Sequence, residues 1–421
     1  MSETTASSPD LAARNQRIAA RIKQRYAAER RFRALGFCAV FFSALVLAFL
    51  LLTMTSNAVG GFQRTELRFA IDLSQGALTV EPNQLEGPGA LAALEGAGLS
   101  DVVNFAAAQS AGDQAAAQLD DGAWREVAKR LIADPAQLKG RIEVSLPVSD
   151  DLASAWRGEG SDELKALASQ LRQQGKLVRA LDTGFLSRSD ATDPQAVGIW
   201  GALKGSMLTM LVTLLLAFPI GVLSAVYLEE YAPKNRWTEF IEVSINNLAA
   251  VPSIIFGLLG LAVFLTVFPN FRSAPLIGGM TLALMTMPVI VISGRNAIKA
   301  VPPSIRDAAL AIGASRVQTV FHHVLPLALP GILTGTIIGM ARALGETAPL
   351  LMIGMRAFVA SPPDGFTSPA TVLPVQIFLW SDEINRGFVE RTSAAIIVLL
   401  AFLLVMNGLA IYLRNRFEKR W

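Results

Sequence analysis

An arginine and a glutamate lie four positions apart in an otherwise apolar stretch of this chain. On a helix, Arg342 and Glu346 would share one face and could form an ion pair. A charge near the middle of a membrane costs at least about 2.5–3.5 kcal/mol, so charged residues there normally face a cavity or a partner. The pair therefore predicts either a path for a charged solute or a structural ion pair that fixes helix packing.

Residue types that support metal binding or covalent catalysis are scarce. Cys38 is the single cysteine, so the chain can form neither an internal disulfide nor a cysteine metal site. His322 and His323 are adjacent and would point in different directions on a helix, which makes them a poor metal pair. The glycine-rich P-loop pattern that holds ATP phosphates is absent. We therefore expect no catalytic residue, no metal site and no cofactor bound by this chain.

A polar loop, residues 294–326, contains the signals of a short surface helix. Pro302 and Pro303 end any incoming helix, and Asp307 would lie in the first turn of a new one, where a negative charge suits the helix dipole. Gly313 can end this helix in a left-handed conformation. The expected apolar face consists of Ile305, Ala308, Ala309 and Ile312. Such a helix is either a connector at the membrane surface or a docking element for a cytoplasmic partner.

The apolar stretch after this loop carries small residues at regular intervals. Gly331, Gly335 and Gly339 form two overlapping GxxxG steps, and Ala343 continues the row. Rows of small residues let helices approach closely in a membrane. We therefore expect this face to be a helix-packing surface.

Composition and apolar runs indicate an integral membrane protein. Of 421 residues, 52% are hydrophobic and 17% are charged, which is too apolar for an ordinary soluble chain. Lys plus Arg (37) exceed Asp plus Glu (34) by three, which gives no reason to expect nucleic acid as a partner. Runs long enough to cross a hydrocarbon core of about 30 Å predict six helical spans in the lipid bilayer. They lie within 36–58 and near 205–228, 246–268, 276–293, 327–354 and 393–413.

The segments outside these runs differ in charge. Residues 1–35 are basic and are expected to form an amphipathic cytoplasmic segment before transmembrane helix 1 at 36–58. Residues 60–195 have no run of spanning length and contain 13 basic and 20 acidic residues, which predicts a soluble domain outside the cell membrane. Five further spans follow in 200–415, and the basic residues flanking the spans place both termini in the cytoplasm.

The segment 60–195 shows two kinds of periodicity. Leu67, Phe69 and Ile71 alternate with polar residues, as do Ile142, Val144 and Leu146, and such alternation predicts strands. Alanine-rich stretches at 123–133 and 162–180 predict helices. We therefore expect a mixed α/β domain.

Two motifs resemble a known family. Asp307-Ala308-Ala309, then Gly313 and Leu325-Pro326, resembles the EAA loop of ABC-importer permeases, with Asp307 in place of Glu and His323 where Ile is usual. The stretch from Arg342 to Leu351, with 251–258 and 373–377, resembles PstA-type permeases of phosphate ABC transporters. The resemblance covers about residues 200–415.

The resemblance implies an all-α polytopic protein with six transmembrane helices in the type I ABC importer fold, and an α/β domain inserted between helices 1 and 2. It implies a phosphate-transport subunit in the bacterial inner membrane, not an enzyme. Its partners would be a second permease of the PstC type, a homodimeric cytoplasmic ATPase that binds ATP, and an extracytoplasmic phosphate-binding protein. The substrate path would include Arg342, Glu346 and Thr347. The ATPase contact would include Ile305, Arg306, Asp307, Ala308, Ala309, Ile312 and Gly313.

Three alternatives compete with this interpretation. The chain could be a permease for another oxyanion, sulfate or molybdate, although the stretch from Arg342 to Leu351 argues against it. It could be a membrane sensor whose 60–195 domain binds a ligand, but a sensor needs no ATPase dock. A membrane enzyme is disfavoured because the spans hold no clustered carboxylates.

Overall fold

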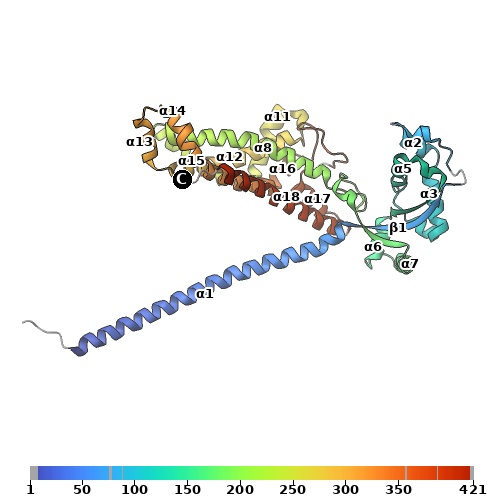
Figure 1. The fold of residues 1–421 in the computed structure, drawn as a ribbon, viewed down its shortest axis with the longest axis horizontal. Helices are drawn as coiled ribbons and strands as arrows, with labels where there is room; N and C mark the ends of the chain where they lie inside the picture. Colours follow the sequence, from blue (N-terminus) through green and yellow to red (C-terminus); the bar gives the residue numbers. More distant parts are fainter. Residues whose placement is uncertain (1–7, 75–77, 88, 356–357, 386, 418–421) are drawn as a thin grey trace, which may run out of the picture. The chain divides into compact units, whose positions relative to one another are not determined.

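The computed structural model describes residues 8–74, 78–87, 89–355, 358–385 and 387–417 (Figure 1). Its contacts divide the chain into two units, Met1–Ser56 and Asn57–Trp421. Most of helix α1 (Ser8–Gly61), which is continuous over 54 residues, belongs to the first unit. The basic segment predicted at 1–35 and the span predicted at 36–58 are therefore joined in one helix. Residues 1–7 of that prediction lie outside the described residues.

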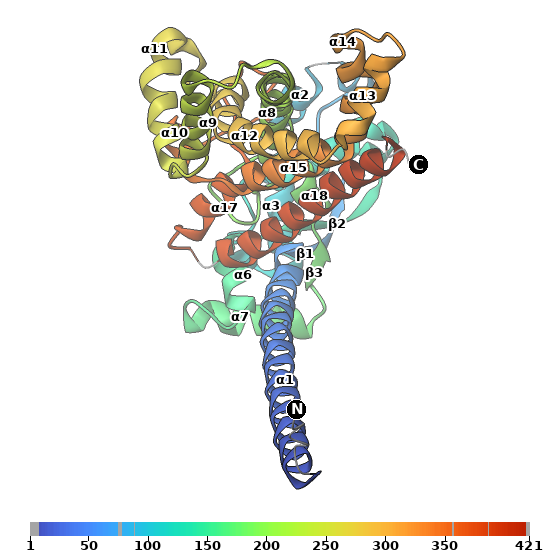
Figure 2. The same ribbon diagram turned by 90° about the vertical axis from the view of Figure 1, so that its left-hand side faces the viewer.

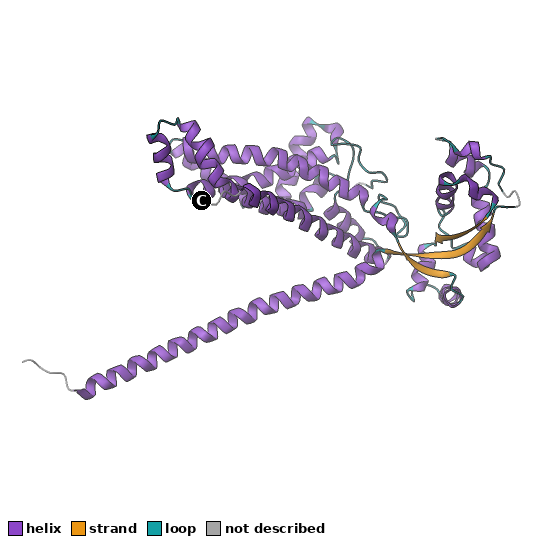
Figure 3. Cartoon of the chain, viewed as in Figure 1, coloured by secondary structure: helices purple, strands orange, loops and turns teal. Residues whose placement is uncertain are grey.

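The strands of the described chain form one small sheet (Figure 3). Strand β1 (Gln63–Asp72) lies in the middle and pairs antiparallel with β2 (Arg141–Pro147) and β3 (Leu177–Leu181). Phe69 is opposite Val144, and Leu67 is opposite both Leu146 and Leu177. The alternating apolar residues of β1 and β2 are buried, so the two strands predicted from alternation are confirmed.

Short helices pack against the buried apolar side chains of this sheet and form one core with them. They are η1 (Pro82–Leu85), α2 (Ala90–Gly96), α3 (Leu99–Ala111), α4 (Asp113–Ala116), α5 (Trp124–Ala133), η2 (Pro135–Lys139), α6 (Asp150–Trp156) and α7 (Asp162–Gln173). The turn η3 (Thr183–Leu186) instead places Phe185 in a second core, with Trp380 and Phe388. The helix predicted at 123–133 is α5. The helix predicted at 162–180 is wrong beyond Gln173, because Gly175 adopts φ +70° and the chain continues as β3.

Among the described residues, five helices are long and apolar enough to cross a membrane. They are Arg21–Gly61, Trp200–Tyr231, Pro275–Lys299, Arg316–Gly345 and Gly387–Arg416. These stretches contain α1, α8 (Trp200–Val226), η4 (Tyr227–Tyr231), α12 (Pro275–Lys299), α14 (Arg316–Gln318), η7 (Thr319–Val324), α15 (Leu325–Gly345) and α18 (Gly387–Phe417). The segments η4 and η7 are π-helical turns.

A sixth span exists only if a sharply bent pair is counted as one. Helix α9 (Arg236–Ala249) and the stretch Ser253–Val267 meet at an angle of 104°. That stretch comprises α10 (Ser253–Leu259), the π-helical η5 (Gly260–Phe264) and α11 (Leu265–Val267), and η6 (Pro269–Phe271) follows. The span predicted near 246–268 is therefore bent, and it counts as one span only if this pair crosses the membrane together. Pro252 has no N–H to donate and disfavours a helical Val251, so the chain breaks there.

The span predicted at 327–354 is also interrupted. Helix α15 ends at Gly345, and the short helix α16 (Ala348–Met352) begins after Thr347. Helix α17 (Leu373–Ser381) lies between this region and α18.

Helix α12 is the most enclosed of the spans. It packs against α8 on one side and α15 on another, and α15 in turn packs against α18 (Figure 2). Buried apolar side chains such as Ile277, Leu282 and Ile290 fill these contacts. Buried threonines, among them Thr281 and Thr286, donate their hydroxyls to carbonyls one turn earlier, so their polar atoms are satisfied inside the bundle.

Segment 60–195 contacts the start of α18 through buried charges. Arg391 lies near the start of α18, and its Nε and Nη1 donate to the carbonyls of Pro194 and Gly61 at 2.7 and 2.6 Å. Beside it, Trp380 of α17 donates its indole N–H to Asp190 at 3.1 Å. Burial raises the pKa of the Asp190 carboxyl, and the bond from Trp380 opposes that shift.

Candidate functional site

The surface helix expected between two spans is α13 (Pro303–Ala311), on the loop between α12 and α15. Pro302 precedes it in an extended conformation, and Pro303 occupies its first turn, where a missing N–H is tolerated. Gly313 has φ +91°, so the left-handed end predicted for this helix is confirmed.

The predicted apolar face of α13 is divided between two directions. Ala309 is buried, and Ile305 packs on the core around α8, α12 and η7. Asp307 and Ala308 are exposed, and Ile312 is 82% exposed. The expectation of one continuous face is therefore wrong. The inner residues attach the helix to the protein, and the outer residues leave a partly apolar surface uncovered in this chain.

Arg306 lies on the inner side of α13 and pairs with a residue that the sequence did not single out. Its Nη2 lies 2.6 Å from Oε1 of Glu230, in the π-helical turn η4 at the end of α8. The two side chains are 22% and 12% exposed. Two neighbouring acids directly after an apolar run were the available signal, because such residues commonly mark a charged contact at a span's end.

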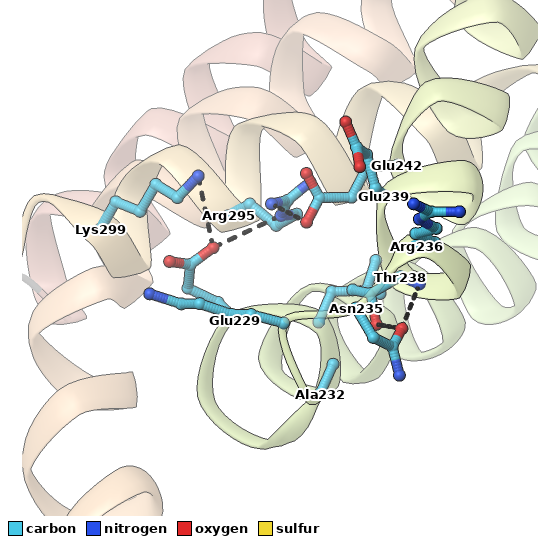
Figure 4. Close-up of a pocket in the computed structure, with 11 residues that line it drawn as sticks. Glu229, Ala232, Asn235, Arg236, Thr238, Glu239, Glu242, Arg295 and Lys299 are labelled. Atoms are coloured by element: carbon cyan, nitrogen blue, oxygen red, sulfur yellow. Dashed lines mark hydrogen bonds and ion pairs between the residues drawn. The ribbon is translucent and has the colours of Figure 1, made fainter.

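A charged cavity of about 580 Å³ lies next to this turn. Figure 4 shows Arg295 of α12 between Glu229 of η4 and Glu242 of α9. Its guanidinium lies 3.4 Å from the first carboxylate and 2.7 Å from the second. Lys299 lies 3.6 Å from Glu229. These ion pairs therefore join η4, α9 and α12 on one side of the cavity.

Arg342, Glu346 and Thr347 come together where α15 ends. Nε of Arg342 lies 3.4 Å from Oε1 of Glu346. Glu346 has left the helix, with φ −78° and ψ 121°, so the pair does not share a continuous helical face as expected. Thr347 follows as the residue before α16. The Arg342 side chain is 49% exposed in this chain, and that of Glu346 is 19% exposed.

The glycine row of α15 packs against α12 of the same chain. A methyl group added at Gly331 would lie 2.7 Å from Cβ of Ala297, and one at Gly339 would lie 2.9 Å from Thr286. One added at Gly335 would overlap the side chain of Ser293. The predicted role of these glycines in close helix packing is consistent with this geometry.

Among the described residues, no group of three or more His, Cys, Asp or Glu side chains could hold a metal ion. The structure therefore offers two candidate sites of a different kind: the outward surface of α13, and the break that contains Arg342 and Glu346.

Two family descriptions match the chain. Residues 217–420 match "Binding-protein-dependent transport system inner membrane component", and residues 19–166 match "Domain of unknown function (DUF3333)". The first match contains α12, α13, α15 and α18. The second contains β1, β2 and most of the short helices packed on the sheet.

Individual relatives match somewhat less than half of the chain. "Probable ABC transporter permease protein YqgI" of Bacillus subtilis (strain 168) is 34% identical over 41% of this chain and 59% of its own length. "Phosphate transport system permease protein PstA 1" of Mycobacterium tuberculosis (strain CDC 1551 / Oshkosh) is 31% identical over 49% of this chain and 67% of its own length. The chain thus spans less than two thirds of the first of these relatives.

One solved structure shows how weakly this chain resembles known structures. The MetNI methionine ABC transporter, in an inward-facing conformation and its CY5 native crystal form, is 18% identical with a TM-score of 0.41. The alignment covers 53% of this chain and 95% of that chain. This likeness is too distant to establish the fold.

Proposed function

Since this chain is a PstA-type member of the family of binding-protein-dependent transport system inner membrane components, we propose that it is the permease subunit of an ATP-driven phosphate importer. The observation that carries the proposal is α13, an exposed helix on a loop between two spans, inside the residues that match the family. An importer permease needs such a helix because it binds no ATP itself and must receive motion from an ATPase.

The proposed architecture is a type I importer permease with six spans and an α/β domain inserted after the first. The bent pair of α9 and Ser253–Val267 then counts as one span. The protein lies in the bacterial cytoplasmic membrane with both termini in the cytoplasm and residues 60–195 outside. The Arg30, Arg31 and Arg33 cluster before the first apolar run supports this orientation.

The proposed complex contains a second permease of the PstC type and two copies of a cytoplasmic ATPase. A phosphate-binding protein delivers cargo outside. ATP binding closes the two ATPase copies, and α13 passes that motion to the spans. The exposed side chains of Asp307, Ala308 and Ile312 suit the ATPase contact, because Ile312 is an apolar group on a surface that would otherwise face water.

The phosphate path passes the break after α15. Arg342 presents a planar fork of donors that matches two phosphate oxygens, and its exposure leaves the fork available. Glu346 offsets this charge while the path is empty, and its carboxylate can accept a hydrogen bond from a protonated phosphate oxygen. Sulfate carries no such proton at neutral pH, so Glu346 would favour phosphate over sulfate. Thr347 adds a hydroxyl beside them.

Uptake of radiolabelled phosphate into vesicles that contain the full complex tests the proposal. We expect uptake that requires ATP, the binding protein and this chain. Excess unlabelled sulfate or molybdate should compete poorly. ATP-driven uptake of sulfate or molybdate without phosphate uptake would contradict the assignment of the cargo.

A further inference from the structure

The guanidinium of Arg306 joins three elements at one point. Its Nη2 and Nε lie 2.6 and 3.0 Å from Oε1 of Glu230 in η4. Its Nη1 donates to the carbonyl of Val301 at 2.7 Å, and Nη2 also donates to the carbonyl of Ile298 at 3.0 Å. These carbonyls belong to the last turn of α12 and to the residues just after it. Arg306 thus connects α13 to the ends of both α8 and α12.

The remaining contacts of α13 are modest. Ala309 is the buried residue of the helix, Ile305 adds a partly buried side chain, and α13 packs on η7. Small apolar contacts of this kind fix neither direction nor register closely. A charge-assisted pair with two donors fixes distance and orientation together. The Arg306–Glu230 pair is therefore the contact that determines whether α13 and α8 move together.

The neighbouring acid holds the same turn from another direction. Successive side chains on a helix point about 100° apart, so Glu229 and Glu230 reach different neighbours. Glu229 contacts Arg295 and Lys299 of α12, and Arg295 continues to Glu242 of α9 (Figure 4). The turn η4 is thus held to α12 through Glu229, and it pairs with α13 through Glu230.

We propose that Glu230 is a positioning residue for energy coupling: through Arg306 it makes α13 and the cytoplasmic end of α8 move as one body when the ATPase closes. The inference rests on the proposed function, because it assumes that α13 receives the ATPase's motion. Without the pair, α13 rocks on η7 while α8 stays in place. ATP hydrolysis then continues, but less of it opens the spans.

A distance measurement tests whether the Glu230–Arg306 pair couples α13 to η4, and it does not depend on the cargo. Spin labels go on Ser304→Cys of α13 and Tyr227→Cys of η4, both exposed, in a Cys38→Ser background of the assembled complex. We expect their separation to stay the same when a non-hydrolysable ATP analogue is added. With Glu230→Gln, the separation should change on addition of the analogue. A changing separation without the Glu230 substitution would overturn the proposal.

Glu239→Gln is the matched control, since Glu239 is an exposed glutamate that lines the cavity next to η4, and it should leave the separation constant. Where Glu230→Gln prevents assembly, Arg306→Lys takes its place, because lysine keeps the charge and loses the second donor nitrogen. The separation should then change as well. A constant separation in the assembled variant would overturn the proposal.

The transport yield provides a second test. Phosphate moved per ATP hydrolysed should fall at least about fivefold in Glu230→Gln while ATP hydrolysis persists. In Glu230→Cys with Arg306→Cys, a short bifunctional thiol reagent should restore the yield, because it ties the two elements together again. An unchanged yield in Glu230→Gln, or a cross-linked variant that stays uncoupled, would contradict the coupling role of the Glu230–Arg306 pair. Absence of phosphate uptake by the unsubstituted complex would instead contradict the proposed cargo. The spin-label distance would still test whether α13 and the end of α8 move together.

Discussion

Nη2 of Arg391 in α18 lies 3.0 Å from Oδ2 of Asp182, and both side chains are buried. The same carboxylate oxygen lies 2.6 Å from Nη2 of Arg188. One aspartate just after β3 therefore holds two arginines, one on α18 and one on the chain that leads into α8. The domain of residues 60–195 is connected to the spans by a buried charge network as well as by the chain itself.

Asp182→Asn should lower the free energy of unfolding by about 3–5 kcal/mol, because it leaves the buried Arg391 without its counter-charge. Thermal unfolding of the purified chain in detergent measures this change. Asp162→Asn is the control, since Asp162 is fully exposed and pairs with Lys165 at 3.3 Å on the surface. Equal shifts in the two variants would show that the network does not contribute to stability.

Ile312→Asp should weaken assembly of the ATPase on the permease by about tenfold or more, because burying an isoleucine contributes about 1.5–3 kcal/mol. Binding of purified ATPase to permease immobilised in detergent measures the effect. Ile384→Asp introduces the same change at an isoleucine that is also exposed but lies between α17 and α18. Assembly should be normal in that control, and a normal affinity in Ile312→Asp would exclude the outward surface of α13 as the dock.

Arg342→Gln should reduce phosphate uptake about ten- to a hundredfold, because hydrogen bonds to charged groups contribute about 1.5–3 kcal/mol. Arg342→Lys should be impaired less, since it keeps the charge without the planar fork. Uptake assays with equal amounts of assembled complex measure both. Arg272→Gln, at an exposed arginine in the loop after α11, should transport normally.

The double change Arg342→Gln with Glu346→Gln separates transport from helix packing. If the pair only fixes packing, the double variant should regain uptake because no charge is left unpaired. We expect a complex that assembles and does not transport. Near-normal uptake by the double variant would remove Arg342 from the phosphate path.

Labelling with an impermeant thiol reagent should modify Gln173→Cys but not Arg316→Cys in intact cells, each in a Cys38→Ser background. Both positions are exposed, so access depends on the side of the membrane. After the cells are opened, both should react. Labelling of position 316 and not 173 in intact cells would reverse the proposed orientation.

Asp190→Asn should become increasingly stabilising, relative to the unsubstituted chain, as pH rises from about 4 through the raised folded-state pKa of Asp190. Burial raises the pKa of Asp190 in the folded state, so the folded chain holds more protons than the unfolded chain between the two pKa values. Stability is therefore lost as pH rises through that window, and asparagine removes the loss while still accepting the bond from Trp380. Thermal unfolding across this pH range measures the difference.

Asp72→Asn is the control of opposite sign. The hydroxyl and backbone N–H of Ser74 lower the pKa of Asp72, so its ionised form contributes stability that is lost as pH falls through the folded-state pKa. Its replacement should therefore become more destabilising as pH rises to about 4 and then stay constant, so the measurements extend below pH 4. Parallel pH dependence in the two variants would contradict the assignment of Asp190.

Local signals predicted local structure well. The glycine at 313 and the prolines before α13 identified a short helix, and alternation identified β1 and β2, because each depends on backbone preferences of a few residues. The broken spans were missed, because apolar length alone does not reveal a bend. Pro252 was the sign available for one break, and Glu346 after Gly345 for the other.

The contacts between distant residues could not be predicted in the same way. Arg306 and Glu230 are 76 positions apart, and Arg391 meets the carbonyl of Gly61 across 330 positions. Only the packing of α8, α12 and α18 brings such pairs together. Arg342 was found because its charge is unusual in an apolar stretch, whereas Glu230 lies at the edge of one, where charges are ordinary.

The length of α1 has a consequence for the space around the membrane. With about 1.5 Å of rise per residue, its 54 residues extend about 80 Å, whereas a hydrocarbon core of about 30 Å accommodates about 40 Å of helix even at a tilt of 40°. Roughly half of the helix must then lie among headgroups or in water. Because the apolar run ends close to Gly61, that surplus precedes it and carries Arg21, Lys23, Arg25, Arg30, Arg31 and Arg33. The N-terminal part of α1 is therefore a positively charged helix outside the hydrocarbon core, and its length sets how far those charges lie from the apolar run.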